Sequence, residues 1–254
     1  MSGEREHPTG REPSGAERAD PLTAYRLPLT GREGQTLGGD SLLIRYVNLV
    51  KLPHTLFALP FALLGVLAAA QLNSLCLWLS PLALGWILLY SLSKRFTWWP
   101  HLWLGVSLAI APVGGYLAVT GRWSQPAWVL LAITLAVATW VAGFDIFYAL
   151  PDAGFDRAEG LRSAVVRLGE SRAIRLAKLL HGVTIPALAL FGYGAGFGPW
   201  YYMGLITAAA ILAYEHQLVR PGDLSRLDAA FFTMNGVMSL TVFGFALLDW
   251  AVRR

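Results

Sequence analysis

The sequence has little charge and almost no cysteine. Lys, Arg, Asp and Glu together make up 14% of the 254 residues, whereas soluble domains carry about 25%. Hydrophobic residues make up 55%, and the mean hydropathy is +0.50. This balance argues against a soluble globular domain and indicates a membrane protein. The single cysteine, Cys76, excludes an intramolecular disulfide and a cysteine-based metal site.

Residues 1–40 contain no long apolar run, which argues against a cleaved secretory signal peptide. They are rich in Gly, Pro, Glu, Arg, Ser and Thr. Such a composition buries too little apolar surface to offset the entropy of folding. We predict a disordered cytoplasmic tail over residues 1–44 and a membrane domain over residues 45–254.

From about residue 52 the chain alternates between long apolar runs and short polar intervals. A membrane-spanning helix needs about 20 apolar residues, and we count seven candidate runs. They are LPHTLFALPFALLGVLAAAQL, LCLWLSPLALGWILLYSL, LWLGVSLAIAPVGGYLAVT, AWVLLAITLAVATWVAGF, IRLAKLLHGVTIPALALFGYG, YYMGLITAAAILAY and AAFFTMNGVMSLTVFGFALLDW. Several runs contain prolines, which bundled membrane helices tolerate because neighbouring groups satisfy the freed carbonyls. The pattern predicts an all-α fold, a polytopic membrane helical bundle with about seven transmembrane helices.

Basic residues are unevenly divided between the two sides of this predicted bundle. If the tail is cytoplasmic, ten of them lie on the cytoplasmic side and three on the other. The ten are Lys94, Arg95, Arg157, Arg162, Arg167, Arg172, Arg175, Lys178, Arg220 and Arg226; the three are Arg122, Arg253 and Arg254. Because cytoplasmic loops carry an excess of Lys and Arg, we expect the loops after the second, fourth and sixth runs to face the cytoplasm.

The segment GFDIFYALPDAGFDRAEG, residues 143–160, places four acids at the end of an apolar run. A helix turns by about 100° per residue, so Asp145, Asp152 and Asp156 would share one face of an unbroken helix. Pro151 either kinks that helix or begins a new one with Asp152 near its N-terminus. In both cases Asp152 and Asp156 form a DxxxD pair whose side chains can converge.

Two carboxylates one helical turn apart repel each other unless a cation lies between them. Mg²⁺ suits this position, because it takes one or two carboxylates and completes its shell with water and phosphate oxygens. Lys94 and Arg95 on one loop, and Arg157 and Arg162 on another, could hold the rest of a diphosphate. Spacing alone leaves plain surface ion pairs open as the alternative. Asp145 differs, because an acid at the edge of an apolar span is costly and usually functional.

Five stretches of this sequence together resemble one known family. They are KLPHTLFALPFALLG at 51–65, YSLSKRFTW at 90–98, LAIAPVGGYLAVTG at 108–121, GFDIFYALPDAGFDRAEGLRSAVVRLG at 143–169 and YEHQLVRPGDLSRLDAAFFTMNG at 214–236. In content and order they resemble the UbiA-type aromatic prenyltransferases, in the 4-hydroxybenzoate polyprenyltransferase branch. The resemblance covers nearly everything from about residue 45 to the C-terminus.

The resemblance implies an all-helical membrane fold around a central cavity. It also implies Mg²⁺-dependent ionisation of a polyprenyl diphosphate, followed by attack of an aromatic acceptor on the allylic cation. By residue match, Asp152 and Asp156 would be the catalytic residues that hold Mg²⁺ and diphosphate. The matched substrate-binding positions are Asp145 and Tyr148 lining the cavity, Lys94 and Arg95 at the diphosphate or its metal-bound form, and Arg162 and Ser163 following them.

The sequence departs from this family in one large feature. The family carries a first acidic motif, NxxxDxxxD, and nine spans, whereas we count seven. No asparagine here has an acid four positions later, and no acid occurs between Asp40 and Asp145. Within residues 64–73 a family-like first helix runs directly into what resembles the end of the third, so a helix pair is missing. A diphosphate clamped from one side loses transition-state stabilisation, and we expect strongly impaired activity.

The sequence therefore predicts a membrane enzyme, a UbiA-like polyprenyltransferase. It would transfer a polyprenyl group from a polyprenyl diphosphate to an aromatic acid acceptor such as 4-hydroxybenzoate, in ubiquinone or menaquinone biosynthesis. We expect Mg²⁺ as cofactor, no nucleic-acid partner, and a place in the lipid bilayer of a bacterial cytoplasmic (inner) membrane with active-site loops facing the cytoplasm. The alternative is a catalytically inactive homologue or a binding partner in a quinone-synthesis complex. A small-solute transporter would need acids at the bilayer middle and inverted repeats, and neither is evident.

Four further polar residues lie in or at the end of apolar runs. We predict that His181 is a core histidine with satisfied hydrogen bonds. Asn235, inside the last run, needs a hydrogen-bond partner across helices or on the acceptor. For Glu215 and His216, at the end of the sixth run, lining a cavity and marking the span boundary are equally compatible with the pattern.

Overall fold

The protein is described here by a computed structural model that covers residues 63–227 and 229–253. Over these ranges the chain is helical apart from turns and one isolated β-bridge. After a short helical segment, Leu63–Leu72, come α3 (Ser74–Phe96), α4 (Pro100–Thr120), α5 (Ala127–Tyr148), α6 (Ala153–Ala158), α7 (Ala164–Leu168), α8 (Glu170–Gly194), α9 (Pro199–Leu218), the π-helical turn η4 (Ala229–Met234) and α10 (Asn235–Val252). The all-α prediction is confirmed.

Five helices of the described part are long and apolar enough to cross a membrane: α3, α4, α5, α8 and α10. They coincide with five of the seven predicted runs. The sixth predicted run lies in α9, which has 20 residues but is not among the five. Most of the first predicted run, and the boundary between tail and membrane domain, fall outside the described residues. The count of seven therefore stays a prediction.

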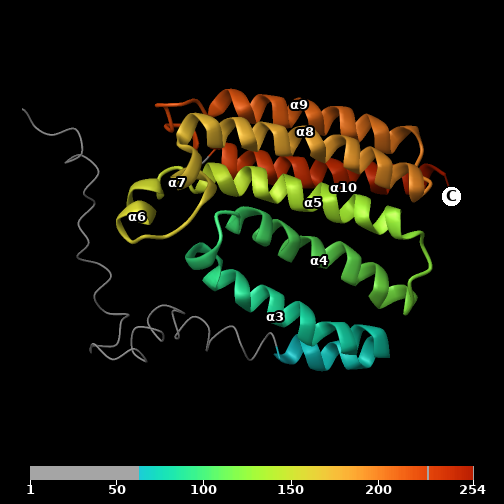
Figure 1. Cartoon of the computed structure of the whole chain (residues 1–254). Helices are drawn as coiled ribbons and strands as arrows, with labels where there is room; N and C mark the ends of the chain where they lie inside the picture. The colour runs from blue at the N-terminus through green and yellow to red at the C-terminus, as the bar shows by residue number, and fades with distance from the viewer. Residues whose placement is uncertain (1–62, 228, 254) are drawn as a thin grey trace, which may run out of the picture. The chain divides into compact units, whose positions relative to one another are not determined.

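The helix α5 lies at the centre of the bundle (Figure 1). It packs against α4 on one side and α8 on the other, while α9 contacts both α8 and α10. In the most apolar window of α5, 56% of residues are buried, against none in the corresponding window of α3. Side chains on α5 therefore have neighbours on several helices, whereas α3 contacts the bundle mainly through α4.

The outer helix α3 is held to α4 at two levels. Asn73 caps α3 by accepting a hydrogen bond from Cys76 N–H at 2.9 Å, and its amide donates to the carbonyl of Leu117 at the far end of α4, at 3.0 Å. Further along, Trp103 Nε1 donates to the carbonyl of Trp86 at 3.0 Å, and the two indoles stack with centroids 4.3 Å apart. These contacts position the C-terminal end of α3, which carries Lys94, beside the start of α4.

Two glycines allow close helix approach to α5. A Cβ on Gly105 would overlap the backbone of Ala138, and a Cβ on Gly143 would overlap the ring of His181. Larger residues at these points would push α4 or α8 away from α5. Small residues at helix crossings are a common feature of membrane bundles, where close backbone packing replaces the hydrophobic effect.

The acidic stretch does not form one continuous helix. α5 ends at Tyr148, Pro151 lies in a turn, and α6 begins at Ala153 with Asp152 as the residue before it. Of the two alternatives for Pro151, a break followed by a new helix is therefore correct. The one-face arrangement expected of an unbroken helix does not apply to Asp145, because the two DxxxD residues lie beyond the break.

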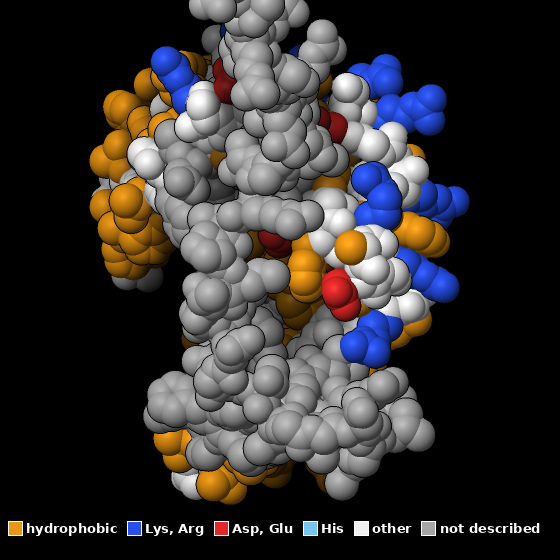
Figure 2. Space-filling view, turned by 90° about the vertical axis from the view of Figure 1, so that its left-hand side faces the viewer, with side chains coloured by type: hydrophobic (Ala, Val, Ile, Leu, Met, Phe, Trp, Pro, Cys, Tyr) orange, Lys and Arg blue, Asp and Glu red, His pale blue; other side chains and the backbone are white. Residues whose placement is uncertain are grey.

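One end of the bundle collects the basic residues. The last turns of α3 and α9, the start of α8, and the short helices α6 and α7 all lie there, and ten of the Lys and Arg residues belong to these segments and the loops beside them. Figure 2, which faces this end, shows Lys and Arg side chains gathered along one side of it. The opposite end carries Arg122 and Arg253 among the described residues. The predicted asymmetry of charge is thus an asymmetry between two ends of the folded bundle.

Candidate active site

Lys94 and Asp156 form a buried ion pair at the basic end of the bundle. Lys94 Nζ lies 3.2 Å from Asp156 Oδ1 and 2.9 Å from Oδ2, so it bridges both carboxylate oxygens. Only 2% of the Asp156 side chain is exposed, and a carboxylate buried to this degree needs a counter-charge. The pair joins the last turn of α3 to α6, two segments 62 residues apart in the sequence.

Arg162 fixes the loop after α6 against the turn between α3 and α4. Its backbone N–H donates to the carbonyl of Lys94 at 2.6 Å, and its Nη1 donates to the carbonyl of Phe96 at 3.1 Å. Its guanidinium also lies over the Trp98 ring, 5.6 Å from the centroid, and Arg167 lies over the same ring at 5.8 Å. The α3–α4 turn and the α6–α7 segment therefore form one connected structure.

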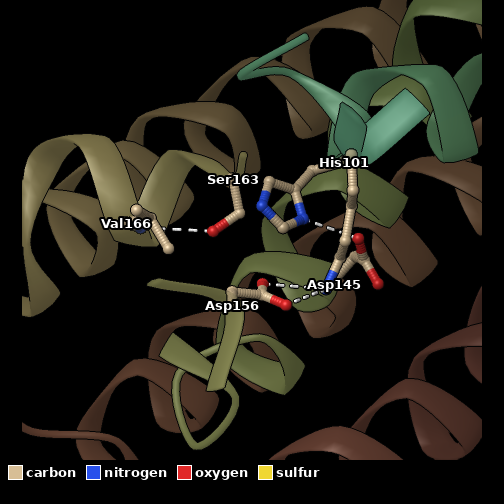
Figure 3. A network of polar contacts seen from close by, with 6 residues as sticks. His101, Asp145, Asp156, Ser163 and Val166 are labelled. Atoms are coloured by element: carbon tan, nitrogen blue, oxygen red, sulfur yellow. Dashed lines mark hydrogen bonds and ion pairs between the residues drawn. The ribbon is translucent and has the colours of Figure 1, made fainter. Parts of the chain in front are cut away.

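A second polar pair, His101 with Asp145, lies near Asp156 in Figure 3. His101 Nδ1 is 2.6 Å from Asp145 Oδ2, and only 1% of His101 is exposed. An ionised carboxylate only accepts hydrogen bonds, so Nδ1 carries the proton and donates. The other ring nitrogen, Nε2, is buried and has no hydrogen-bond partner among the described residues.

Ser163 supports the local backbone. It precedes α7, and its Oγ accepts a hydrogen bond from Val166 N–H at 3.2 Å, the usual arrangement of a helix N-cap. The side chain is fully buried. This contact gives Ser163 a structural role in holding α7, and its predicted role in substrate binding stays a prediction.

Three other predicted site residues are exposed at the same end. Arg95 lies in the last turn of α3, Tyr148 ends α5 with 52% of its surface exposed, and Asp152 stands just before α6. The backbone N–H of Asp156 donates to the carbonyl of Asp152 at 2.8 Å, so the two acids are one helical turn apart. The structure thus brings Lys94, Asp156 and Arg162 together. It leaves the other three residues exposed at the same end of the bundle.

The residues present fit a Mg²⁺ ion only in a limited way. Asp152 is accessible, but Asp156 is already neutralised by Lys94. Within residues 63–227 and 229–253, no group of three or more His, Cys, Asp or Glu side chains is arranged to hold a metal. Such a set suits Mg²⁺ that takes most of its ligands from a diphosphate and water. It does not suit an ion held by the protein alone.

An apolar cavity of about 440 Å³ opens inside the bundle, lined by residues of α4, α5, α8, α9 and α10 and by Phe197 before α9. Its walls include Trp140, Leu188, Tyr201 and Phe243. Trp140 and Asp145 are five residues apart on α5, or about 7.5 Å along the helix axis. Along the axis of α5, the wall of the cavity at Trp140 therefore lies about one and a half turns from Asp145.

Below the polar end, a separate histidine cluster is closed within the helices. His181 Nε2 lies 3.1 Å from the carbonyl of Trp140, and its Nδ1 lies 3.1 Å from His216 Nε2. The prediction of a core histidine is confirmed. Glu215 beside it is fully buried, so it is not an exposed boundary residue. Asn235 has the partner it was expected to need, because it accepts a hydrogen bond from Trp140 Nε1 at 3.0 Å.

His101 was missed by sequence reasoning, although a weak signal was present. The histidine directly follows Pro100 at the start of an apolar helix, six residues after Arg95. A buried position for its ring could not be inferred from that context, because the partner Asp145 is 44 residues away in the sequence.

Comparison with known proteins decides the family. The model of the UbiA prenyltransferase family matches residues 54–237. The chain belongs to the UbiA prenyltransferase family. Among its relatives is a 4-hydroxybenzoate octaprenyltransferase of Alcanivorax borkumensis, 35% identical over 63% of this chain and 55% of the relative. A second, from Nitrosospira multiformis, is 30% identical over 78% of this chain and 67% of the relative.

Solved structures agree with this UbiA assignment. An apo structure of a UbiA homologue from Aeropyrum pernix K1 superposes with a TM-score of 0.68 at 25% identity, covering 91% of this chain and 78% of that one. A structure of digeranylgeranylglyceryl phosphate synthase, with a TM-score of 0.58 at 16% identity, shares the fold. With its apolar helices and these relatives, the UbiA-family chain is an integral membrane protein.

The UbiA-family chain is short relative to its curated relatives. Its matches span 55% and 60% of the lengths of the octaprenyltransferases of Alcanivorax borkumensis and Pseudomonas syringae. The sequence has no acid between Asp40 and Asp145.

Proposed function

We propose that the protein transfers a polyprenyl group from a polyprenyl diphosphate to an aromatic acid acceptor, such as 4-hydroxybenzoate, in quinone biosynthesis. One observation carries the proposal: charged groups cluster at the bundle end, and Asp145 at that end is about one and a half turns of α5 from Trp140 in the wall of a 440 Å³ apolar cavity. A polyprenyl diphosphate has this same division between a charged head and a hydrocarbon chain. Membership in the UbiA family and the names of its relatives support the same reaction.

The charged end would supply the diphosphate with fixed cations and with two carboxylates for a divalent ion. Lys94 and Arg162 are fixed by the contacts with Asp156 and Phe96, and Arg95 is exposed beside them. Fixed cations stabilise negative charge that develops on a leaving group without reorganising during the reaction. Asp152, with Asp156, would hold Mg²⁺, which when bound supplies further positive charge at the departing diphosphate.

We further propose that this end faces the cytoplasm of a bacterial inner membrane. Ten Lys and Arg residues belong to this end and two of the described ones to the other. Cytoplasmic loops are enriched in these residues. An aromatic acid dissolved in the cytoplasm would then reach the exposed residues at this end directly.

We expect strongly reduced activity, because the resemblance to the family implies a first acidic motif that this sequence lacks. The competing proposal is a catalytically inactive homologue or a binding partner in a quinone-synthesis complex. The Lys94–Asp156 pair favours this competitor, since the cation of Lys94 already occupies the place where a metal would neutralise Asp156.

A turnover assay tests the proposal and separates it from this competitor. The purified full chain in nanodiscs would be incubated with a polyprenyl diphosphate, radiolabelled 4-hydroxybenzoate and Mg²⁺. We expect slow formation of prenylated product that EDTA abolishes. Asp152→Asn should lower the rate further, whereas Asp223→Asn, an exposed acid in the loop after α9, should leave it unchanged. Absence of any product above a protein-free control would reject the enzymatic proposal.

A further inference from the structure

The His101–Asp145 pair is a built polar site that the diphosphate chemistry does not use. His101 lies in the first turn of α4 and Asp145 in the last turn of α5. Their hydrogen bond, at 2.6 Å, crosses between the two helices where they meet at the basic end. In Figure 3 the imidazole lies between Asp145 and Ser163, and its second nitrogen points away from Asp145.

The chemistry of the pair fixes what that second nitrogen can bind. When Nδ1–H donates its hydrogen bond to Asp145, the neutral form of His101 presents an accepting lone pair at Nε2. This atom is buried and lacks a partner among the described residues. A buried acceptor without a donor costs free energy, so its retention beside Asp156 and Ser163, at the charged end of the bundle (Figure 3), points to a ligand that brings the donor.

The neutral imidazole does not match a diphosphate or the carboxylate of an aromatic acid, because the ionised oxygens of both groups only accept hydrogen bonds. Anions are also better placed beside the cations Lys94 and Arg162 than beside Asp145. The matching group is a hydroxyl or amino group on an aromatic ring.

We propose that His101 Nε2 binds the acceptor substrate by accepting a hydrogen bond from its ring hydroxyl, with Asp145 as the positioning residue that fixes the imidazole. The inference deepens the proposed function and rests on it for the identity of the ring. A hydrogen bond at the hydroxyl oxygen raises electron density on the ring carbons beside it, which are the carbons that attack an allylic cation. His101 thereby selects acceptors that carry a donor group on the ring.

Equilibrium binding of small aromatic acids to the full chain in detergent tests this without requiring turnover. The probes are 4-hydroxybenzoate, 4-aminobenzoate and benzoate, which share the carboxylate and differ only in the ring donor. We expect the first two to bind about tenfold more tightly than benzoate, the value of one good hydrogen bond. Equal affinity of the native protein for all three would overturn the inference, and this arm needs no variant to fold.

Two matched substitutions then assign the effect to one nitrogen. His101→Asn keeps a donor near the Nδ1 position for Asp145 but has no group at Nε2, whereas His101→Gln places an amide oxygen near Nε2. His101→Asn should abolish the preference for 4-hydroxybenzoate over benzoate, and His101→Gln should restore most of it. If His101→Asn lost affinity equally for 4-hydroxybenzoate and benzoate, or instead bound a polyprenyl diphosphate more weakly, the histidine would not accept a hydrogen bond from the ring hydroxyl.

The two proposals fail separately. If the chain binds 4-hydroxybenzoate with the expected preference but forms no product, the histidine inference holds and the enzymatic proposal fails. If product forms while benzoate and 4-hydroxybenzoate bind alike, the enzymatic proposal holds and the histidine inference fails.

Discussion

Lys94 combines a contact with Asp156 in the folded chain and a proposed role in substrate binding. It lies in the last turn of a peripheral helix, yet its ammonium contacts both oxygens of the buried Asp156. Removing one member of such a pair leaves an uncompensated buried charge, which costs more than the pair itself contributes. The same cation is available to a diphosphate only if Asp156 gains another counter-charge, such as a metal ion.

Lys94→Ala is therefore expected to destabilise the fold by about 3 kcal/mol, the cost of orphaning a buried carboxylate. Thermal unfolding in detergent, followed by circular dichroism, measures the effect. Lys94→Arg keeps the charge and should unfold close to the native protein. An unfolding midpoint for Lys94→Ala equal to that of the native chain would show that Asp156 does not depend on this cation.

Asp223, in the loop after α9, offers a test of local electrostatics outside the membrane-spanning segments. Ser225 donates to its Oδ1 from the hydroxyl at 2.7 Å and from the backbone N–H at 3.1 Å, and these bonds lower the pKa of Asp223 from 3.8. A depressed carboxyl pKa stabilises the folded loop above pH 3.8, and this stabilisation is lost as the pH falls through the lower folded value.

Ser225→Ala removes the largest cause and should raise the pKa of Asp223 back toward 3.8. An NMR titration of the side-chain carboxyl in the full chain measures the shift. An unchanged titration midpoint would mean that the hydroxyl contact does not form in solution.

Among the elements, α5 has the greatest influence on the site, because it contacts α4 and α8 and carries Asp145 and Tyr148 in its last turn. Its position depends on close approach to α8 at Gly143, where the His181 ring occupies the space of a Cβ. Gly182 lies on α8 and has open space around it. The two glycines therefore form a matched pair with opposite expectations.

Gly143→Ala should destabilise the bundle by about 1–3 kcal/mol through overpacking, because α8 must shift or His181 must change rotamer. Gly182→Ala should be neutral or slightly stabilising, since alanine is the better helix former in open space. Thermal unfolding of both variants in the same detergent compares them directly. Equal midpoints would contradict the close packing of α5 on α8.

How much of the structure the sequence predicted depends on the range of the contacts involved. Five of the seven predicted apolar runs coincide with helices long enough to span a membrane, since run length is a local property. The sequence alone does not predict the break after Tyr148, because Pro151 is compatible with a kinked helix or with a new one. The pairs Lys94–Asp156 and His101–Asp145 join residues 62 and 44 positions apart, and local patterns carry no information about such partners.

For the whole molecule, the concentration of basic residues at one end predicts its orientation in the membrane. In a Cys76→Ser background, a single cysteine at Ser225 should react with a membrane-impermeant maleimide only in inverted bacterial membrane vesicles. A cysteine at Ser124, in the loop between α4 and α5, should react only in right-side-out vesicles. The reverse labelling pattern would place the charged end outside the cytoplasm.

The central proposal is that the charged end of this UbiA-family bundle binds the diphosphate group of an isoprenoid lipid through its cations and a divalent ion. The most direct measurement is the affinity of the full chain for a non-reactive prenyl thiodiphosphate, with Mg²⁺ and with EDTA. We expect Mg²⁺ to tighten binding at least about tenfold in the native protein, and Asp152→Asn to remove most of that gain. Equal affinity with and without Mg²⁺, or no saturable binding at all, would contradict the account.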